Sequence, residues 1–206
     1  MYKHWDSYVR SIPHPFLAEY SNGKVANAKD ILEGQPFECP MMPFGGMEEF
    51  AWSPDSKKLA YVLRQKKGRD YAVSTDSDIF LYDINDGSSL NLCKPITRDI
   101  KQPVKIDYTR SLKDQRIYEG EDCNLGYDDN PKFSPDGKYI AWTSMKHDGY
   151  ESDRTRLCVY EFSTRNKTYV TESFDSGVDN FFWKENSKEL LFAGVWHGRA
   201  NITQQT

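Results

Sequence analysis

The sequence predicts an all-β fold, a partial β-propeller made of four-stranded antiparallel blades. Two observations predict it. A pattern of strand, tight turn and strand occurs three times, and two further strands follow each of the first two copies. A repeated four-strand unit is the signature of a propeller blade. Aromatic residues make up 14% of the chain, which favours the pleated, half-buried surface of a sheet.

The three copies share an apolar strand, a polar turn and a second apolar strand. They occupy Phe50–Val62, Pro131–Thr143 and, in a more diverged form, Phe181–Ala193. In the turn Ser134–Gly137, proline presets φ for the first central position and glycine supplies the left-handed residue that closes a bulged hairpin. Ser56 and Ser187 replace this glycine in the other copies, which a small polar residue permits.

Two predicted strands complete each of the first two units. After Val62 they lie at Asp78–Ile84 and Ser89–Cys93, and after Thr143 they lie at Arg156–Phe162 and Lys167–Thr171. Both units are therefore four-stranded meanders. A sandwich or barrel of hairpins is the alternative that the pattern leaves open.

The repeat divides the chain into five segments. They are 1–44 (the end of one blade, with strands at Pro15–Tyr20 and Ala28–Leu32), 45–94 (a blade), 95–130 (an insertion between blades), 131–175 (a blade) and 178–206 (the start of a further blade). A closed propeller has roughly 4–8 blades, whereas this chain holds about three blades' worth of sequence. We therefore expect its end sheets to expose apolar faces and to self-associate.

Composition excludes several classes of protein. The net charge is −4 and basic residues are interspersed with acidic ones, so the chain lacks the basic face that nucleic acid requires. No apolar run approaches the roughly 20 residues that span a bilayer, and Met1–Asp6 lacks the apolar core of a signal peptide. Cys39, Cys93, Cys123 and Cys158 are too far apart for a paired zinc motif. Cys93 and Cys158 fall in apolar runs and are predicted to be buried free thiols.

The long connections are predicted to gather at one end of the blades. In a meander, the turns joining strands one to two and three to four lie at one end, and the other connections lie opposite. The second kind are long here: Arg64–Ser77, Ser144–Thr155 and Lys94–Asn130. Loops longer than about 12–15 residues are usually functional or disordered, so functional contacts are expected at that end.

The turns and three further segments resemble a known family. The Ser-Pro-Asp-Gly-type turns are similar to the propeller repeats of TolB-like proteins and prolyl oligopeptidases. Together with Lys3–Tyr8, Gly126–Asp129 and Val195–Ile202, they resemble the N-terminal propeller of bacterial dipeptidyl aminopeptidase/acylaminoacyl-peptidase enzymes, the dipeptidyl-peptidase-5-like branch of the prolyl oligopeptidase family. The resemblance covers essentially the whole chain.

That resemblance implies a serine exopeptidase in which a propeller caps a C-terminal α/β-hydrolase domain and gates peptide substrates. It also favours a periplasmic or secreted location. The sequence itself predicts no cofactor. The nucleophile of such a domain lies on a G-x-S-x-G turn, and this sequence has none. It also lacks the alternation of strands and helices that the hydrolase fold requires, so we assign no catalytic residue.

Propeller carboxylates are the candidate site residues. In related dipeptidyl peptidases such carboxylates hold the free amine of the substrate, because a buried ammonium must be paired. The candidates here are Glu119, Glu121 and Asp122 in the long insertion, and Glu48 and Glu49 before the first repeat. A solvated acidic loop is the alternative for each of them.

Other polar residues have weaker functional readings. The path by which peptides reach the amine-binding carboxylates could also be lined by four residues of the long insertion, Tyr108, Arg110, Arg116 and Tyr118. Ordinary loop packing is the alternative. Some propeller lyases hold a metal with histidines, but His4, His14, His147 and His197 include no pair at ligand spacing, so no metal site is predicted. His197 is instead expected to pack at a strand end. The glycosylation sequons Asn166–Thr168 and Asn201–Thr203 are explained by chance.

Three functions compete at this point. The leading one is a non-catalytic propeller portion of a serine peptidase, whose coding sequence continues into a G-x-S-x-G domain. The second is a TolB-like scaffold for protein–protein interaction, whose coding sequence ends after the remaining blades. The third is a propeller lyase, whose activity a chelator would remove.

Overall fold

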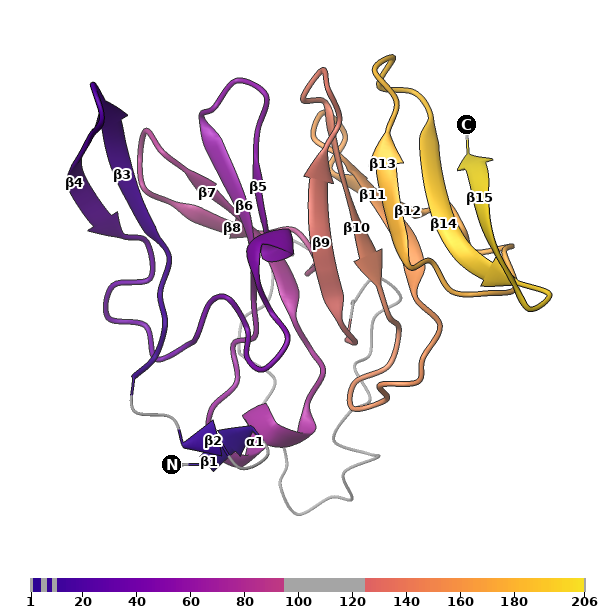
Figure 1. Cartoon of the computed structure of the whole chain (residues 1–206), viewed down its shortest axis with the longest axis horizontal. Helices are drawn as coiled ribbons and strands as arrows, with labels where there is room; N and C mark the ends of the chain where they lie inside the picture. The colour runs from indigo at the N-terminus through magenta and orange to yellow at the C-terminus, as the bar shows by residue number, and fades with distance from the viewer. Residues whose placement is uncertain (1, 5–6, 9–10, 95–124, 206) are drawn as a thin grey trace.

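The computed structural model describes residues 2–4, 7–8, 11–94 and 125–205, and these form five antiparallel sheets (Figure 1). The larger sheets follow one another in sequence order across the molecule, with the chain ends at opposite sides (Figure 1). The helices in these ranges are too short and too polar to cross a bilayer.

Two complete sheets form the centre of the molecule, and each has four strands in sequence order. The first contains β5 (Phe50–Trp52), β6 (Lys58–Leu63), β7 (Asp78–Asp83) and β8 (Ser89–Asn91). The second contains β9 (Asp128–Phe133), β10 (Tyr139–Ser144), β11 (Arg156–Glu161) and β12 (Asn166–Tyr169). Every neighbouring pair is antiparallel, so the predicted four-stranded meanders are confirmed.

Smaller sheets flank the two complete ones. They are the hairpin of β3 (Phe16–Ser21) and β4 (Lys24–Asp30), the three-stranded sheet of β13 (Asn180–Trp183), β14 (Leu190–Trp196) and β15 (Arg199–Gln205), and the short pair of β1 (Tyr2–His4) and β2 (Ser7–Tyr8). His197 lies in the tight turn between β14 and β15, with φ of 50°, at a strand end as expected.

Two sequence predictions about local structure were wrong. The strand expected at Ala28–Leu32 begins earlier, at Lys24, because Asn22 and Gly23 both adopt left-handed backbone (φ 49° and 75°) and close a two-residue hairpin turn. The loop expected over Arg64–Ser77 contains helix α1 (Gly68–Val73). Its first turn holds Asp70, a residue that stabilises a helix start.

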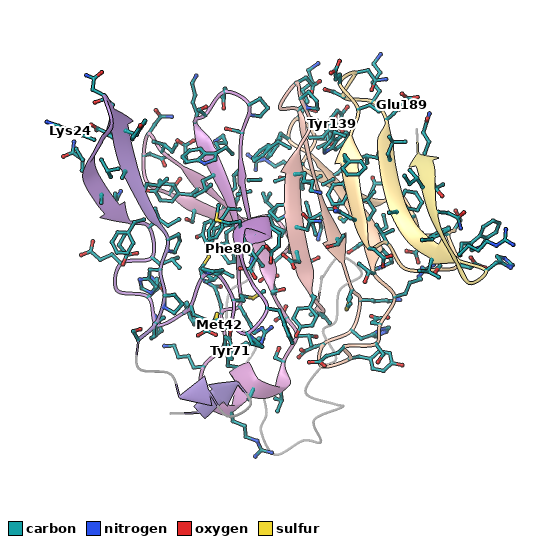
Figure 2. The ribbon with its side chains drawn as sticks, in the orientation of Figure 1. Lys24, Met42, Tyr71, Phe80, Tyr139 and Glu189 are labelled. Atoms are coloured by element: carbon teal, nitrogen blue, oxygen red, sulfur yellow. The ribbon has the colours of Figure 1, made fainter. Side chains whose placement is uncertain are left out.

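Each complete sheet is buried on both faces by neighbouring sheets. Alternate residues of β6 and β7 enter different cores, because successive side chains of a strand point to opposite faces. Leu59, Tyr61 and Phe80, the last labelled in Figure 2, pack in one core with Leu17 of the β3–β4 hairpin. Ala60, Val62, Ile79 and Leu81 instead pack with Ile140, Trp142 and Cys158 of the second sheet. Burial on both faces explains why these strands read as continuous apolar runs.

The second sheet repeats this arrangement against the third. Ala141 and Leu157 point to the opposite face of the second sheet, where they pack with Phe181, Leu190 and Phe192. Cys93 and Cys158 are fully buried free thiols, as predicted, and Cys39 is another. The sheets therefore stack face to face as consecutive blades.

The predicted corners of the three blades lie next to one another. In the first two, a serine Oγ donates to the aspartate two residues later and accepts from a backbone N–H five residues later. The serine–aspartate distances are 2.6 Å for Ser53 and 2.7 Å for Ser134. The Asp136 N–H donates to Ser187 Oγ at 3.0 Å in the next corner, and Gly137 packs against Pro54 in the previous one. Ser56 and Ser187 adopt left-handed backbone (φ 57° and 58°), in place of glycine. Adjacent corners place the blades around a common axis, as a β-propeller requires.

The two end sheets expose apolar side chains. On the β3–β4 hairpin Tyr20 is 75% and Val25 is 68% exposed, and on the third sheet Ile202 is 72% exposed. We expect the chain to self-associate through these faces, so its sedimentation coefficient should rise with concentration. A double Val25→Lys, Ile202→Lys variant should weaken association several-fold. Tyr150→Lys, at an exposed loop residue, should not. A concentration-independent monomer would contradict this expectation.

Candidate ligand-binding cavity between two blades

An open cavity of about 890 Å³ lies between the first and second complete blades. Its walls come from the loop before β5, the segment around α1, the start of β9 and the loop after β10. The connections Arg64–Ser77, which contains α1, and Ser144–Thr155 meet at this end of the molecule, opposite the corners, as the meander geometry predicted for them (Figure 1). Most of the third long connection, Lys94–Asn130, lies outside the described residues. Its volume lies within the roughly 300–1,000 Å³ of ordinary ligand sites.

Glu49 forms the acidic end of the cavity. It closes the short 3₁₀ helix η1 (Met47–Glu49) and is only 1% exposed. Its Oε2 accepts a hydrogen bond from Met41 N at 2.8 Å, and so holds the apolar loop 41–45 against the cavity. Gly45 permits this packing, since a Cβ there would collide with Glu49 Oε1 and with Met41 O.

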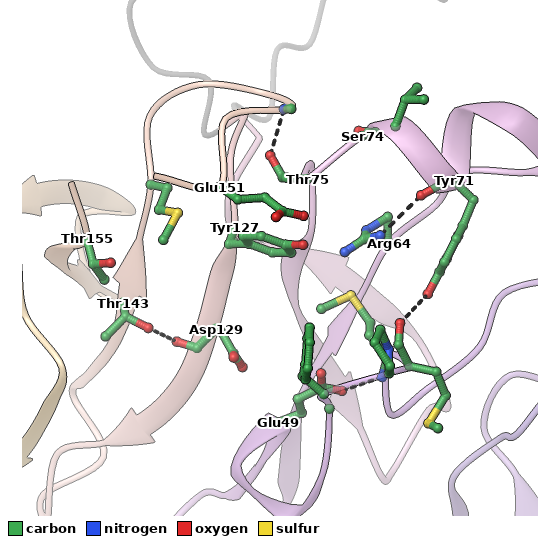
Figure 3. A pocket seen from close by; sticks show the side chains of 18 of the residues that line it. Glu49, Arg64, Tyr71, Ser74, Thr75, Tyr127, Asp129, Thr143, Glu151 and Thr155 are labelled. Atoms are coloured by element: carbon green, nitrogen blue, oxygen red, sulfur yellow. Dashed lines mark hydrogen bonds between the residues drawn. The ribbon is translucent and has the colours of Figure 1, made fainter. Parts of the chain in front are cut away.

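Asp129 faces Glu49 from the second blade, and the two carboxylates point toward one another (Figure 3). Burial raises the pKa of Glu49 to about 8, and the Asp129 and Glu48 carboxylates add to this rise by repulsion. Burial also raises the pKa of Asp129, again with a contribution from Glu48. A cation entering between Glu49 and Asp129 would reverse these shifts, because it favours the ionised carboxylates.

Arg64 forms the opposite, basic end. It follows β6 directly and lies between the rings of Tyr71 and Tyr127, with its Cζ atom 4.7 Å and 5.4 Å from their centroids (Figure 3). Its Nη1 donates to the backbone oxygen of Tyr71 at 3.2 Å. The Tyr71 hydroxyl donates to the buried Glu38 and so fixes the stacking ring. Met42 lies beside Tyr71 in the same wall (Figure 2).

Hydrogen bonds join the two blades across the cavity rim. Asp148 Oδ1, in the loop after β10, accepts from Ser74 Oγ at 2.7 Å and from Thr75 N at 2.8 Å. Gly149 N donates in return to Thr75 Oγ1 at 2.8 Å, as drawn in Figure 3. The relative position of the two cavity walls is therefore fixed by direct contacts.

Comparison with known proteins identifies the relationship. No protein-family model matches the chain. Dipeptidyl-peptidase 5 of Porphyromonas gingivalis is 42% identical over all 206 residues, which are 26% of that protein. Dipeptidyl-peptidase 5 of Porphyromonas endodontalis is 40% identical over 76% of the chain and 19% of that protein. The chain is homologous to dipeptidyl-peptidase 5.

The alignment with the P. gingivalis dipeptidyl-peptidase 5 includes both walls of the cavity, because it covers the whole chain. The chain spans only about a quarter of the length of that relative. Among solved structures, TolB from Acinetobacter baumannii matches 76% of the chain and 28% of its own, at 22% identity and a TM-score of 0.44. The predicted resemblance to the dipeptidyl-peptidase-5-like branch is confirmed.

The structure brings one of the predicted carboxylates into the cavity. Glu49 lines it, while Glu48 lies exposed on the same helix and acts on the cavity through its charge. The other predicted site residues lie outside the described residues: Glu119, Glu121, Asp122, Tyr108, Arg110, Arg116 and Tyr118. The sequence analysis did not propose Asp129 or Arg64 as site residues, although Asp129 ends the family-like segment Gly126–Asp129.

A separate group of possible metal ligands is buried between the same two blades. The ligand atoms of Asp78, Cys93 and Asp128 lie within 4.8 Å of one another, and none of the described histidines joins them. Burial raises the pKa of the Cys93 thiol well above its usual value, which keeps it protonated. Lys94 already neutralises Asp78, at 2.9 Å from its Oδ2. We assign no metal to this group.

Proposed function

We propose that this chain is the non-catalytic propeller portion of a serine exopeptidase of the dipeptidyl-peptidase 5 type. In the complete enzyme it gates the access of peptides and docks an α/β-hydrolase domain. The observation that supports this most strongly is the 42% identity to dipeptidyl-peptidase 5 over the whole chain. The cavity lies at the end that holds α1 and the connection Ser144–Thr155, and that end is the proposed docking face.

Within this function, the acidic end of the cavity receives the α-ammonium group of the peptide. Glu49 and Asp129 lie on different blades and face the same space. A buried ammonium requires charged acceptors, and two carboxylates supply them. Glu49, with its pKa near 8, would release its proton when the ammonium binds.

A pair of blocked dipeptides tests the amine site directly on this chain. We expect alanyl-alanine amide to bind at least about tenfold more tightly than N-acetyl-alanyl-alanine amide in titration calorimetry, since one charge-assisted pair is lost. The double variant Glu49→Gln, Asp129→Asn should remove this preference. Asp136→Asn, at the corner on the opposite end, should keep it. Equal binding of the two peptides by the unaltered chain would refute the amine site.

A peptidase assay tests whether this chain lacks catalytic activity of its own. The chain alone should release no product from dipeptidyl substrates, and its coding sequence should continue into a domain with G-x-S-x-G. Cleavage by the chain alone that a serine-directed inhibitor stops would contradict the non-catalytic role. A coding sequence that ends without such a domain would favour a protein-binding scaffold instead.

A further inference from the structure

Arg64 is a buried positive charge that forms no ion pair with any of the described residues. Its side chain lines the cavity and the residue is only 6% exposed. None of the described carboxylates forms an ion pair with it, and its Nε has no hydrogen-bond partner among the described residues. The faces of Tyr71 and Tyr127 offset part of the cost of burying the guanidinium, but they accept no hydrogen bond from its edge.

Arg156 provides the contrast within the same chain. It is similarly buried, its guanidinium lies over Tyr169 at 4.0 Å, and its Nε also lacks a partner. However, its Nη1 pairs with Glu172 at 3.3 Å, and it does not line the cavity. The uncompensated guanidinium is thus the one that faces the cavity.

The two ends of the cavity differ in chemistry, with the carboxyl groups of Glu49 and Asp129 at one end and the Arg64 guanidinium at the other. Arg64 lies close enough to Glu49 for its charge to act against the rise in the Glu49 pKa. A ligand that satisfies both ends must carry an ammonium group and a carboxylate a short distance apart. Guanidinium groups bind carboxylates in paired geometry, which gives the basic end a preference for that group.

We propose that the cavity binds free dipeptides, with the ammonium group between Glu49 and Asp129 and the C-terminal carboxylate on Arg64. This inference rests on the proposed function, because a dipeptidyl peptidase releases free dipeptides. A longer peptide carries its C-terminal carboxylate far from its amine, whereas every released dipeptide carries both charges close together. The propeller therefore retains the product of the reaction and makes the enzyme sensitive to product inhibition.

Three probes test this on the unaltered chain: alanyl-alanine, its C-terminal amide and N-acetyl-alanyl-alanine. We expect the free dipeptide to bind about tenfold or more tightly than the amide, because the amide removes the negative charge that pairs with Arg64. Equal affinities for the dipeptide and its amide, with no binding of the acetylated peptide, would overturn the role of Arg64 and leave the amine site standing. Failure of all three to bind would overturn both.

Matched arginine variants locate the effect. Arg64→Met should reduce the ratio of dipeptide to amide affinity to about one, while the amide binds as before. Arg156→Met should leave the ratio unchanged. Thermal unfolding of each variant reports whether it is folded. If Arg64→Met does not fold, Arg64→Lys replaces it; that variant keeps the charge but loses the paired geometry, and the ratio should fall. A ratio that survives both Arg64 substitutions would overturn the proposal.

Discussion

The free energy of unfolding of this chain is expected to fall between pH 5 and pH 8, and replacing Glu49 with glutamine should remove a large part of that fall. The folded chain raises the pKa of Glu49 from 4.5 to about 8, so in this window it keeps a proton that the unfolded chain releases. The free energy of unfolding therefore falls as pH rises, and above about pH 8 the loss is complete. At about 1.36 kcal/mol per pKa unit, the loss amounts to as much as roughly 4–5 kcal/mol.

Glutamine keeps the acceptor for Met41 N but cannot ionise, so the variant should match the unaltered chain at pH 5 and exceed its stability at pH 8. Urea unfolding at several pH values measures this difference. Glu48→Gln is the control, since Glu48 is exposed on the same short helix and should change the profile little. The pKa of Asp129 is also raised, so it contributes to the pH dependence of both proteins. The contribution of Glu49 is therefore the difference between the stability curves of the variant and the unaltered chain. Parallel curves for Glu49→Gln and the unaltered chain would refute the assignment.

Replacing Lys94 with methionine is expected to destabilise the chain by about 3–5 kcal/mol, because it leaves buried carboxylates without their cation. Lys94 Nζ lies 2.9 Å from Asp76 Oδ1 and 2.9 Å from Asp78 Oδ2, and these aspartates are 4% and 3% exposed. Both carboxylates raise the pKa of Lys94, which keeps it charged. Lys66 also pairs with Asp76. In the Lys94→Met variant, Asp76 therefore keeps one lysine partner, whereas Asp78 loses its ion pair with Lys94.

Denaturant unfolding at neutral pH measures this loss, and Asp78→Asn in the Lys94→Met background should recover part of it. Lys138→Met supplies the matched control. Lys138 pairs with Asp136 at 3.5 Å with its own side chain 74% exposed, and an exposed pair contributes about 0–1 kcal/mol. Similar losses for the two lysine variants would contradict the role of Lys94.

The blades were predictable because their signals are local. The apolar runs and the Ser-Pro-Asp turns lie within a few residues of one another, and turn chemistry alone required the left-handed conformation at Ser56 and Ser187. Helix α1 was missed because its six residues, with a glycine at the start, are too short for helical periodicity to appear.

The cavity was only partly predictable because its residues come from separate blades. Glu49 could be named as a carboxylate near the first repeat, but its raised pKa depends on burial that the sequence does not reveal. Asp129 and Arg64 become neighbours of Glu49 only when the two blades pack. A signal for Arg64 did exist: it is a charged residue directly after the apolar strand Lys58–Leu63.

Because side chains alternate along β6 and β10, each complete sheet contributes one face to each of two hydrophobic cores. Neither face of a complete sheet can be satisfied without a neighbour, so the unit of folding is a pair of adjoining sheets rather than a single one. Heating is therefore expected to fray the β3–β4 hairpin and the third sheet first. The shared core around Trp142, fully buried between the complete sheets, should resist amide hydrogen exchange longest.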